Sequence, residues 1–134
     1  MDISFTDREL DVMAVLWRRG SGTVNEVREA LDDELAYTTV LTILRTLEEK
    51  EFVTHLSEGK AHRYVPAVSQ DVAGKSALAR VLDKIFDGSS EMLLTQLVSD
   101  RALNAAELQR LRTLLDERLD ARQARKKTAK RRKS

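Results

Sequence analysis

Residues 36–47 have the sequence Ala-Tyr-Thr-Thr-Val-Leu-Thr-Ile-Leu-Arg-Thr-Leu. Apolar side chains recur there at the i, i+3, i+4, i+7 spacing of one helix face, at Val40, Ile43, Leu44 and Leu47. The spacing predicts a helix from about Tyr37 to Lys50. Its opposite face carries short polar side chains and one cation in place of the usual glutamates and lysines: Thr38, Thr39, Thr42, Arg45 and Thr46.

That polar face has two interpretations. Threonine is a mediocre helix former, so four threonines on one face without a packing reason favour a contact role. Threonine hydroxyls can bond phosphates or bases, their methyl groups can contact thymine, and Arg45 can bind guanine or phosphate. The alternative is an ordinary amphipathic helix with a threonine-rich solvent face. Tyr37 could equally anchor the start of the helix in the core.

Two short helices are predicted before residue 36. Thr6-Asp7-Arg8-Glu9 and Thr23-Val24-Asn25-Glu26 both have the form of a capping box, in which a threonine hydroxyl and a glutamate each satisfy an N–H of the first turn. Gly20-Ser21-Gly22 ends the first helix. Apolar side chains at helical spacing follow each box, so both helices bury one face.

A β-hairpin is predicted after the third helix. Phe52 to Ser57 and Lys60 to Val65 are short β-compatible runs, separated by Glu58-Gly59. The second run carries three basic side chains, Lys60, His62 and Arg63. Three short helices followed by a basic hairpin match a winged helix-turn-helix, so we expect residues 1–68 to form a DNA-binding head.

The remainder of the chain is predicted to be helical. Helical patterns cover about 72–86, 90–99 and 104–119, which makes the fold class mostly α. Three helices of this size enclose too little core for an independent fold, so residues 71–121 are expected to form a dimerisation domain with a second copy of the chain. The expected dimer contacts are apolar: Leu94, Leu97, Val98, Leu108, Leu111 and Leu115.

The formal net charge of +1 conceals two parts of opposite sign. Residues 1–121 contain 15 basic and 22 acidic residues, a charge of −7, whereas residues 122–134 contain eight basic and no acidic residues. This tail has no large apolar side chain, so we expect it to be disordered in free solution. A solubilising role is one reading of it. The other is a cationic appendage that offsets the repulsion between the acidic body and a polyanion.

Several function classes are disfavoured by composition. The chain has no cysteine, no Gly-rich phosphate loop and no HExxH motif, so no nucleophile–base pair is apparent and we do not expect an enzyme. No apolar run is long enough to cross a bilayer and the N-terminus does not read as a signal peptide, which predicts a cytoplasmic protein without membrane contact. A winged helix that binds another protein, as an adaptor, remains the alternative to DNA binding.

The two histidines, His55 and His62, fall in the predicted hairpin. A two-residue turn at Glu58-Gly59 would place them directly opposite each other, which is a possible two-ligand metal site. No third ligand is evident, and a bulge at Gly59 would break the pairing. We therefore expect the two histidines to be wing residues that lie near DNA phosphate. We expect no bound metal and no cofactor.

Three stretches of the sequence carry a family resemblance: Thr23-Val24-Asn25-Glu26-Val27, residues 36–47, and His62-Arg63-Tyr64-Val65-Pro66. Over residues 5–120 they make the chain resemble the penicillinase-repressor family, which includes β-lactamase, methicillin-resistance and copper-responsive repressors. The resemblance implies a homodimeric repressor whose winged-helix heads bind double-stranded DNA at a dyad operator.

The resemblance also bears on how repression is relieved. Copper-responsive members use C-terminal cysteines, which this chain lacks. The β-lactamase repressors are cleaved at an Asn-Phe bond, where this chain reads Gln96-Leu97. We therefore expect neither thiolate-bound metal nor that cleavage, and any upstream sensor or protease is unknown.

Overall fold

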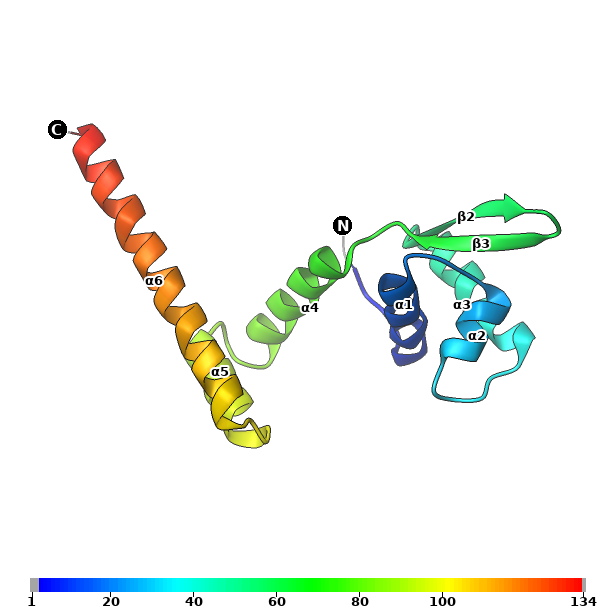
Figure 1. Cartoon of the computed structure of the whole chain (residues 1–134), viewed down its shortest axis with the longest axis horizontal. Helices are drawn as coiled ribbons and strands as arrows, with labels where there is room; N and C mark the ends of the chain where they lie inside the picture. Colours follow the sequence, from blue (N-terminus) through cyan, green and yellow to red (C-terminus); the bar gives the residue numbers. More distant parts are fainter. Residues whose placement is uncertain (1–2, 134) are drawn as a thin grey trace. The chain divides into compact units, whose positions relative to one another are not determined.

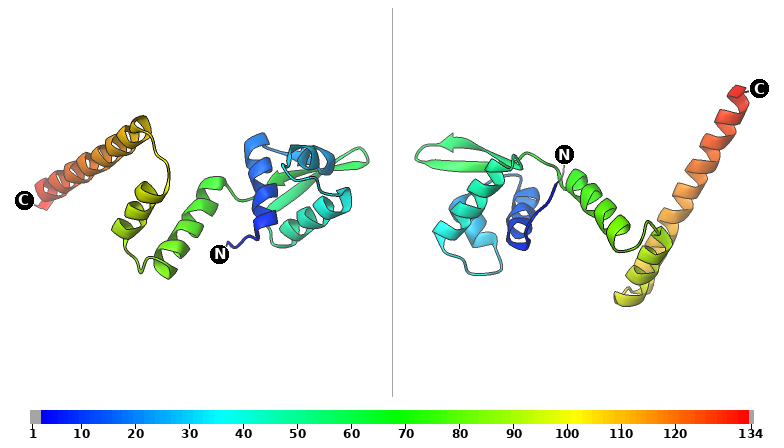
Figure 2. Two further views of the ribbon diagram at one scale, coloured as in Figure 1. Left: turned by 90° about the horizontal axis from the view of Figure 1, so that it is seen from below. Right: turned by 180° about the vertical axis from the view of Figure 1, so that it is seen from behind.

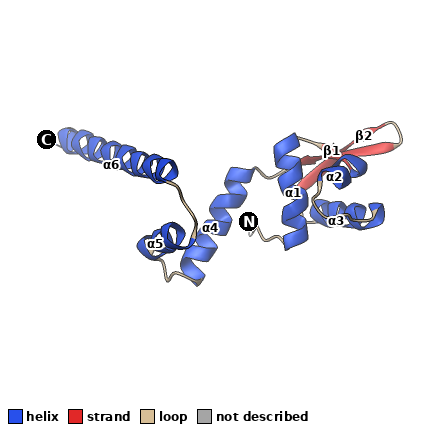
Figure 3. Cartoon of the chain, turned by 60° about the horizontal axis from the view of Figure 1, so that its bottom comes forward, coloured by secondary structure: helices blue, strands red, loops and turns tan. Residues whose placement is uncertain are grey.

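Helices and a small sheet form the first part of the chain, as Figures 1 and 3 show. The structure is a computed structural model that describes residues 3–133. The elements in chain order are α1 (Asp7–Arg19), β1 (Gly22–Thr23), α2 (Val24–Ala30), α3 (Tyr37–Glu49), β2 (Val53–Glu58), β3 (Ala61–Pro66), α4 (Gln70–Lys84), α5 (Ser90–Asp100) and α6 (Ala105–Lys133). The predicted fold class, mostly α with a winged helix-turn-helix, is confirmed.

Both predicted capping boxes are present. The Thr6 N–H donates to Glu9 Oε1 at 2.8 Å, and the Glu9 N–H donates to Thr6 Oγ1 at 3.2 Å. Thr23 and Glu26 repeat the arrangement at 3.0 and 3.2 Å. Gly20 ends α1 with a φ of +89°, a conformation that glycine adopts without strain. These local signals determine where the first two helices begin.

The core of the head lies between α1, α2, α3 and the sheet. The third helix turns one apolar face into it, burying Val40, Leu44 and Leu47 completely. The other fully or almost fully buried side chains come from both adjoining helices and from the sheet: Val12, Met13, Val15, Leu16, Val27, Val53 and Tyr64. Because the apolar face of α3 is fixed in this core, its threonine face points away from the protein.

The sheet has the strand order β1-β3-β2, and both pairings are antiparallel. Its hairpin extends beyond the helices in Figure 2. Glu58 pairs with Ala61, so the turn is Gly59-Lys60 and not the predicted Glu58-Gly59. Gly59 adopts a φ of +61°, which suits the first position of a tight hairpin turn. The shifted turn changes the register of the whole hairpin.

The boundary between the two parts of the chain differs from the expected one. The chain divides into two compact units at Asp87–Gly88, and α4 lies in the first unit, whereas the sequence grouped it with the residues expected to form the dimerisation domain from residue 71. Ala73 of α4 is buried, and the indole N–H of Trp17 donates to the carbonyl of Val68 at 2.8 Å just before α4. These contacts join the end of the wing to α1.

The second unit consists of α5 and α6, and none of its side chains that the structure describes is buried. Asn104 caps α6 by accepting from the Glu107 N–H at 2.8 Å. The helix continues to Lys133, whereas the sequence led us to expect residues 122–134 to be disordered in free solution. No helix within residues 3–133 is long and apolar enough to cross a membrane.

Candidate nucleic-acid interface

The exposed face of α3 is the first part of the candidate interface. The side chains of Thr38, Thr39, Thr42 and Arg45 are all exposed, and Thr46 is half-buried, as the sequence pattern predicted. Arg45 forms no ion pair with any residue from 3 to 133. The face therefore presents methyl groups, hydroxyls and one unpaired guanidinium.

Hydrogen bonds inside the helix divide the threonines into two kinds. Thr42 Oγ1 donates to the carbonyl of Thr38, and Thr46 Oγ1 donates to that of Thr42, both at 2.9 Å. These two hydroxyls have used their only proton, so toward a ligand they can accept but not donate. Their rotamers are also held by the bonds, which fixes the directions of the methyl groups. Thr38 and Thr39 make no such bond and keep a proton to donate.

The N-terminus of α3 has no side-chain cap. Ala36 occupies the N-cap position, and no acidic residue lies in the first turn. Every other helix between residues 3 and 133 has a capping side chain, from Thr6, Thr23, Ser69, Ser89 or Asn104. The Thr39 N–H donates to the Ala36 carbonyl at 3.1 Å, so the N–H groups of Tyr37 and Thr38 and the positive end of the helix dipole are open to an outside anion such as phosphate.

A partly buried ion pair holds the far end of α3 against α1. Lys50, the C-cap residue, donates to both carboxylate oxygens of Glu9 at 2.9 and 2.8 Å. Burial alone would raise the pKa of Glu9, but hydrogen bonds from Lys50 and Thr6 outweigh it and lower that pKa below its ordinary value of 4.5. Glu9 therefore remains ionised and links the α1 cap to the end of α3.

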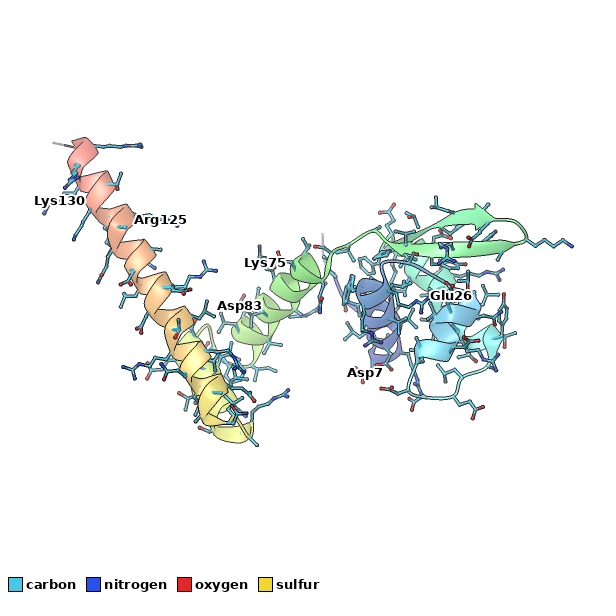
Figure 4. The ribbon with its side chains drawn as sticks, in the orientation of Figure 1. Asp7, Glu26, Lys75, Asp83, Arg125 and Lys130 are labelled. Carbon is cyan, nitrogen blue, oxygen red and sulfur yellow. The ribbon has the colours of Figure 1, made fainter. Side chains whose placement is uncertain are left out.

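The two basic residues of the wing, Lys60 and Arg63, differ in their ion pairs within the described chain. Lys60 lies exposed in the hairpin turn and pairs with no other residue of the described chain. Arg63, in contrast, is bound to Glu26 of α2 at 2.8 Å and to Glu58 at 3.0 Å. Figure 4 labels Glu26 on α2. The sequence grouped Arg63 with the DNA contacts, whereas the structure places it between the wing and α2.

The Arg63 cluster is electrostatically well matched. The Arg63 hydrogen bond and the Thr23 N–H lower the pKa of Glu26, while Glu26 and Glu58 raise the pKa of Arg63. Glu26 thus has two tasks, because it completes the α2 capping box and anchors the hairpin. The capping motif in the sequence predicts the role of Glu26 in the α2 cap, but no pattern in the sequence predicts its ion pair with Arg63.

The two histidines stack but are not directly opposite each other. His55 pairs with Tyr64 and His62 pairs with Ser57, so the predicted His55–His62 pairing is wrong. The imidazoles are diagonal neighbours on one face, with ring centroids 4.3 Å apart and planes 9° apart. His55 Nδ1 lies 2.5 Å from Glu48 Oε2 of α3, which ties the wing to that helix. No group of three potential metal ligands occurs within residues 3–133.

Tyr37 is a candidate contact that the sequence did not assign to the interface. It is the first residue of α3 and is 44% exposed, so it does not anchor the helix in the core. The only signal for it in the sequence was its position immediately before Thr38 and Thr39.

The expected dimer contacts are exposed in the single chain. Leu94, Leu97, Val98, Leu108 and Leu115 are between 38 and 55% exposed, and Leu111 is half-buried. Met92, Leu114 and Leu119 add further exposed apolar surface to α5 and α6. Extended apolar surface that is exposed in a single chain commonly marks a site of protein–protein contact.

Together, a core-anchored third helix with a polar outer face and a basic-tipped hairpin beside it define a winged helix-turn-helix protein. The chain belongs to the penicillinase-repressor family, whose model matches residues 5–117. It is 40% identical to the transcriptional regulator BlaI of Mycobacterium tuberculosis over 118 residues, covering 83% of this chain and 82% of that protein.

The chain is also similar to two further proteins. The penicillinase repressor of Bacillus licheniformis is 25% identical over 114 residues, which cover 84% of this chain and 89% of that protein. The solved DNA-binding domain of the repressor BlaI is 30% identical, with a TM-score of 0.48, over 52% of this chain and 88% of that domain. The relatives are named as regulators and not as enzymes.

Proposed function

We propose that this protein is a dimeric transcriptional repressor whose heads bind the two halves of a dyad operator, each through α3 in the major groove and the wing beside it. The observation that carries the proposal is the outer face of α3, which is fixed by its buried opposite face and bears Arg45 without a partner. An α-helix fits the major groove of B-DNA, where base edges are distinguishable.

The hydrogen bonds of α3 suggest what each side chain reads. Thr42 can only accept, so it suits the amino group of adenine or cytosine, and its methyl group suits a thymine methyl. Arg45 can donate two bonds to guanine. Thr38 and the uncapped N-terminus suit phosphate, which positions the helix without reading sequence.

The wing and the second unit complete the proposed arrangement. Lys60 at the hairpin tip supplies a phosphate contact on the flanking backbone, with the exposed His62 beside it. The uncovered apolar side chains of α5 and α6 are proposed to pack against a second copy. Two heads related by a two-fold axis would read half-sites about 10 or 20 base pairs apart.

Selection of bound sequences from a random DNA pool tests this proposal, because it measures function and symmetry together. We expect a palindromic consensus. On that site Arg45→Ala should cost about 1–3 kcal/mol of binding free energy and relax one position in each half-site. Arg18→Ala is the matched control, since Arg18 is exposed on α1 and has no ion-pair partner in the described chain.

Three outcomes would contradict the proposal or part of it. If Arg45→Ala lowers the affinity for operator and for random DNA equally, Arg45 contacts phosphate and not a base. No loss on either DNA would remove α3 from the interface. A wild-type protein without salt-sensitive affinity for any duplex would favour a protein-binding adaptor instead.

A further inference from the structure

The last twelve residues of α6 form the most strongly charged surface of the chain. Residues 122–133 contain eight lysines and arginines and no acid, and the helix is continuous through them. Arg125 and Lys130 are labelled on this part of α6 in Figure 4. The family model ends at residue 117, so this basic segment, residues 122–133, lies outside the region that the chain shares with the family.

We infer that the basic segment is a second DNA-binding element, which contacts the phosphate backbone without reading sequence. The inference rests on the proposed function, since it adds a contact to a protein already proposed to bind DNA. The first argument is charge density. Twelve helical residues span about 18 Å, so eight charges give about one per 2.2 Å, close to the roughly one phosphate per 1.7 Å of a duplex.

The second argument is that four of the eight cations form no ion pair within the described chain. The side chains of Arg122, Arg125, Lys126 and Lys127 are exposed, and none forms an ion pair with another described residue. Arg122 and Lys126 are also four residues apart, a spacing at which like charges repel on a helix. Phosphate would relieve that repulsion, so binding of DNA and helix formation should strengthen each other.

The third argument is the neutral remainder of the segment, which disfavours a lipid surface. Besides its cations it contains only Gln123, Ala124, Thr128 and Ala129. A helix that binds a membrane interface needs large apolar side chains on one face, and none is present here. The same residues offer little for base recognition, so the contact should not discriminate between sequences.

Two triple variants of the full chain provide the test. One carries Arg125→Gln, Lys126→Gln and Lys127→Gln in the basic segment. The control carries Arg110→Gln, Arg112→Gln and Arg118→Gln, which lie among acidic residues earlier on α6. Each variant lowers the net charge by the same amount, and glutamine has nearly the helix propensity of lysine and arginine, so only the location of the lost charge differs.

The measurement is the affinity for a random-sequence duplex as a function of salt. We expect the basic-segment variant to lose up to about 2.7 from the magnitude of the log–log salt slope, at about 0.9 per phosphate contact. The control should retain most of the slope. Circular dichroism should show the same helix content in the wild type and in both variants, so that a change in slope reflects the lost charge and not a lost helix.

Defined outcomes would overturn the inference. Equal slopes in the two variants would mean that net charge alone matters, and an unchanged slope in the basic-segment variant would mean that the segment does not touch DNA. Loss of binding to phosphatidylserine vesicles, with binding to DNA intact, would assign it to membranes. If wild type does not prefer an operator but the slopes still differ, the proposed function fails and the inference stands.

Discussion

The ion pair between Lys50 and Glu9 allows a quantitative test of how α3 is held in place. The Lys50 ammonium donates to both oxygens of a Glu9 side chain that is only 5% exposed. In Lys50→Met that carboxylate stays buried with Thr6 as its remaining partner. A hydrogen bond to a charged group contributes about 1.5–3 kcal/mol. Because the Lys50 side chain is 40% exposed and screened by water, we expect a loss of roughly 1–2 kcal/mol in the free energy of unfolding.

Urea unfolding followed by circular dichroism measures this loss. Protein concentration must be constant, because a dimer couples stability to concentration. Lys60→Met is the matched control, since this exposed lysine has no partner in the described chain and its replacement should change the free energy of unfolding by less than about 0.5 kcal/mol. In a Glu9→Gln background, Lys50→Met should lower the free energy of unfolding by less, because the buried amide of Gln is neutral and forms no ion pair with the Lys50 ammonium.

The same pair predicts a dependence on pH. The pKa of folded Glu9 is below its ordinary value of 4.5, so the pair stabilises the protein above about pH 4.5 and loses that effect as pH falls through the folded pKa. Wild type and Lys50→Met should therefore converge in stability in acid. If Lys50→Met instead lowers the free energy of unfolding equally in the wild-type and Glu9→Gln backgrounds at every pH, Lys50 acts through the packing of its methylene groups.

Two other predictions concern the dimer and the wing. Replacing Leu111 and Leu115 by Asp should convert the protein to a monomer in sedimentation and abolish operator binding, whereas a wild-type monomer with intact binding would refute the proposed role of α6. Arg63→Gln should release the wing from α2, weaken binding to operator and random DNA by similar factors, and raise the pKa of Glu26 toward its ordinary value. A loss of affinity confined to the operator would instead indicate that Arg63 contacts bases.

Local signals predicted much of the head. The capping boxes at Thr6 and Thr23 and the apolar stripe of α3 depend on residues three or four positions apart, so the sequence contains all the information they need. The turn was less certain because Gly59 fits a two-residue hairpin turn in either of two registers. Because the turn lies one position later than predicted, the two histidines are diagonal neighbours and not directly opposite each other.

Long-range features could not be predicted in the same way. The bond from Trp17 to the Val68 carbonyl joins residues far apart in the sequence, and no pattern marks it, so no local signal indicated that α4 lies in the first compact unit. A basic residue such as Arg63 looks the same whether its partner is DNA or Glu26. The helix over residues 122–133 was not expected from the lack of apolar side chains, but extending an existing helix requires no new nucleus and no packing, and alanine, lysine and arginine are good helix formers.

The missing cap at Ala36 also limits how stable this protein can become while keeping its activity. Replacing an alanine N-cap by serine or aspartate commonly stabilises a helix by about 0.5–2 kcal/mol. Under the proposed function, the added oxygen at Ala36 would compete with phosphate for the N–H groups of the first turn, and an aspartate would also repel the DNA. Selection for thermal tolerance would favour such a change and selection for repression would oppose it, so the most readily improved position of the head is one where improvement costs function.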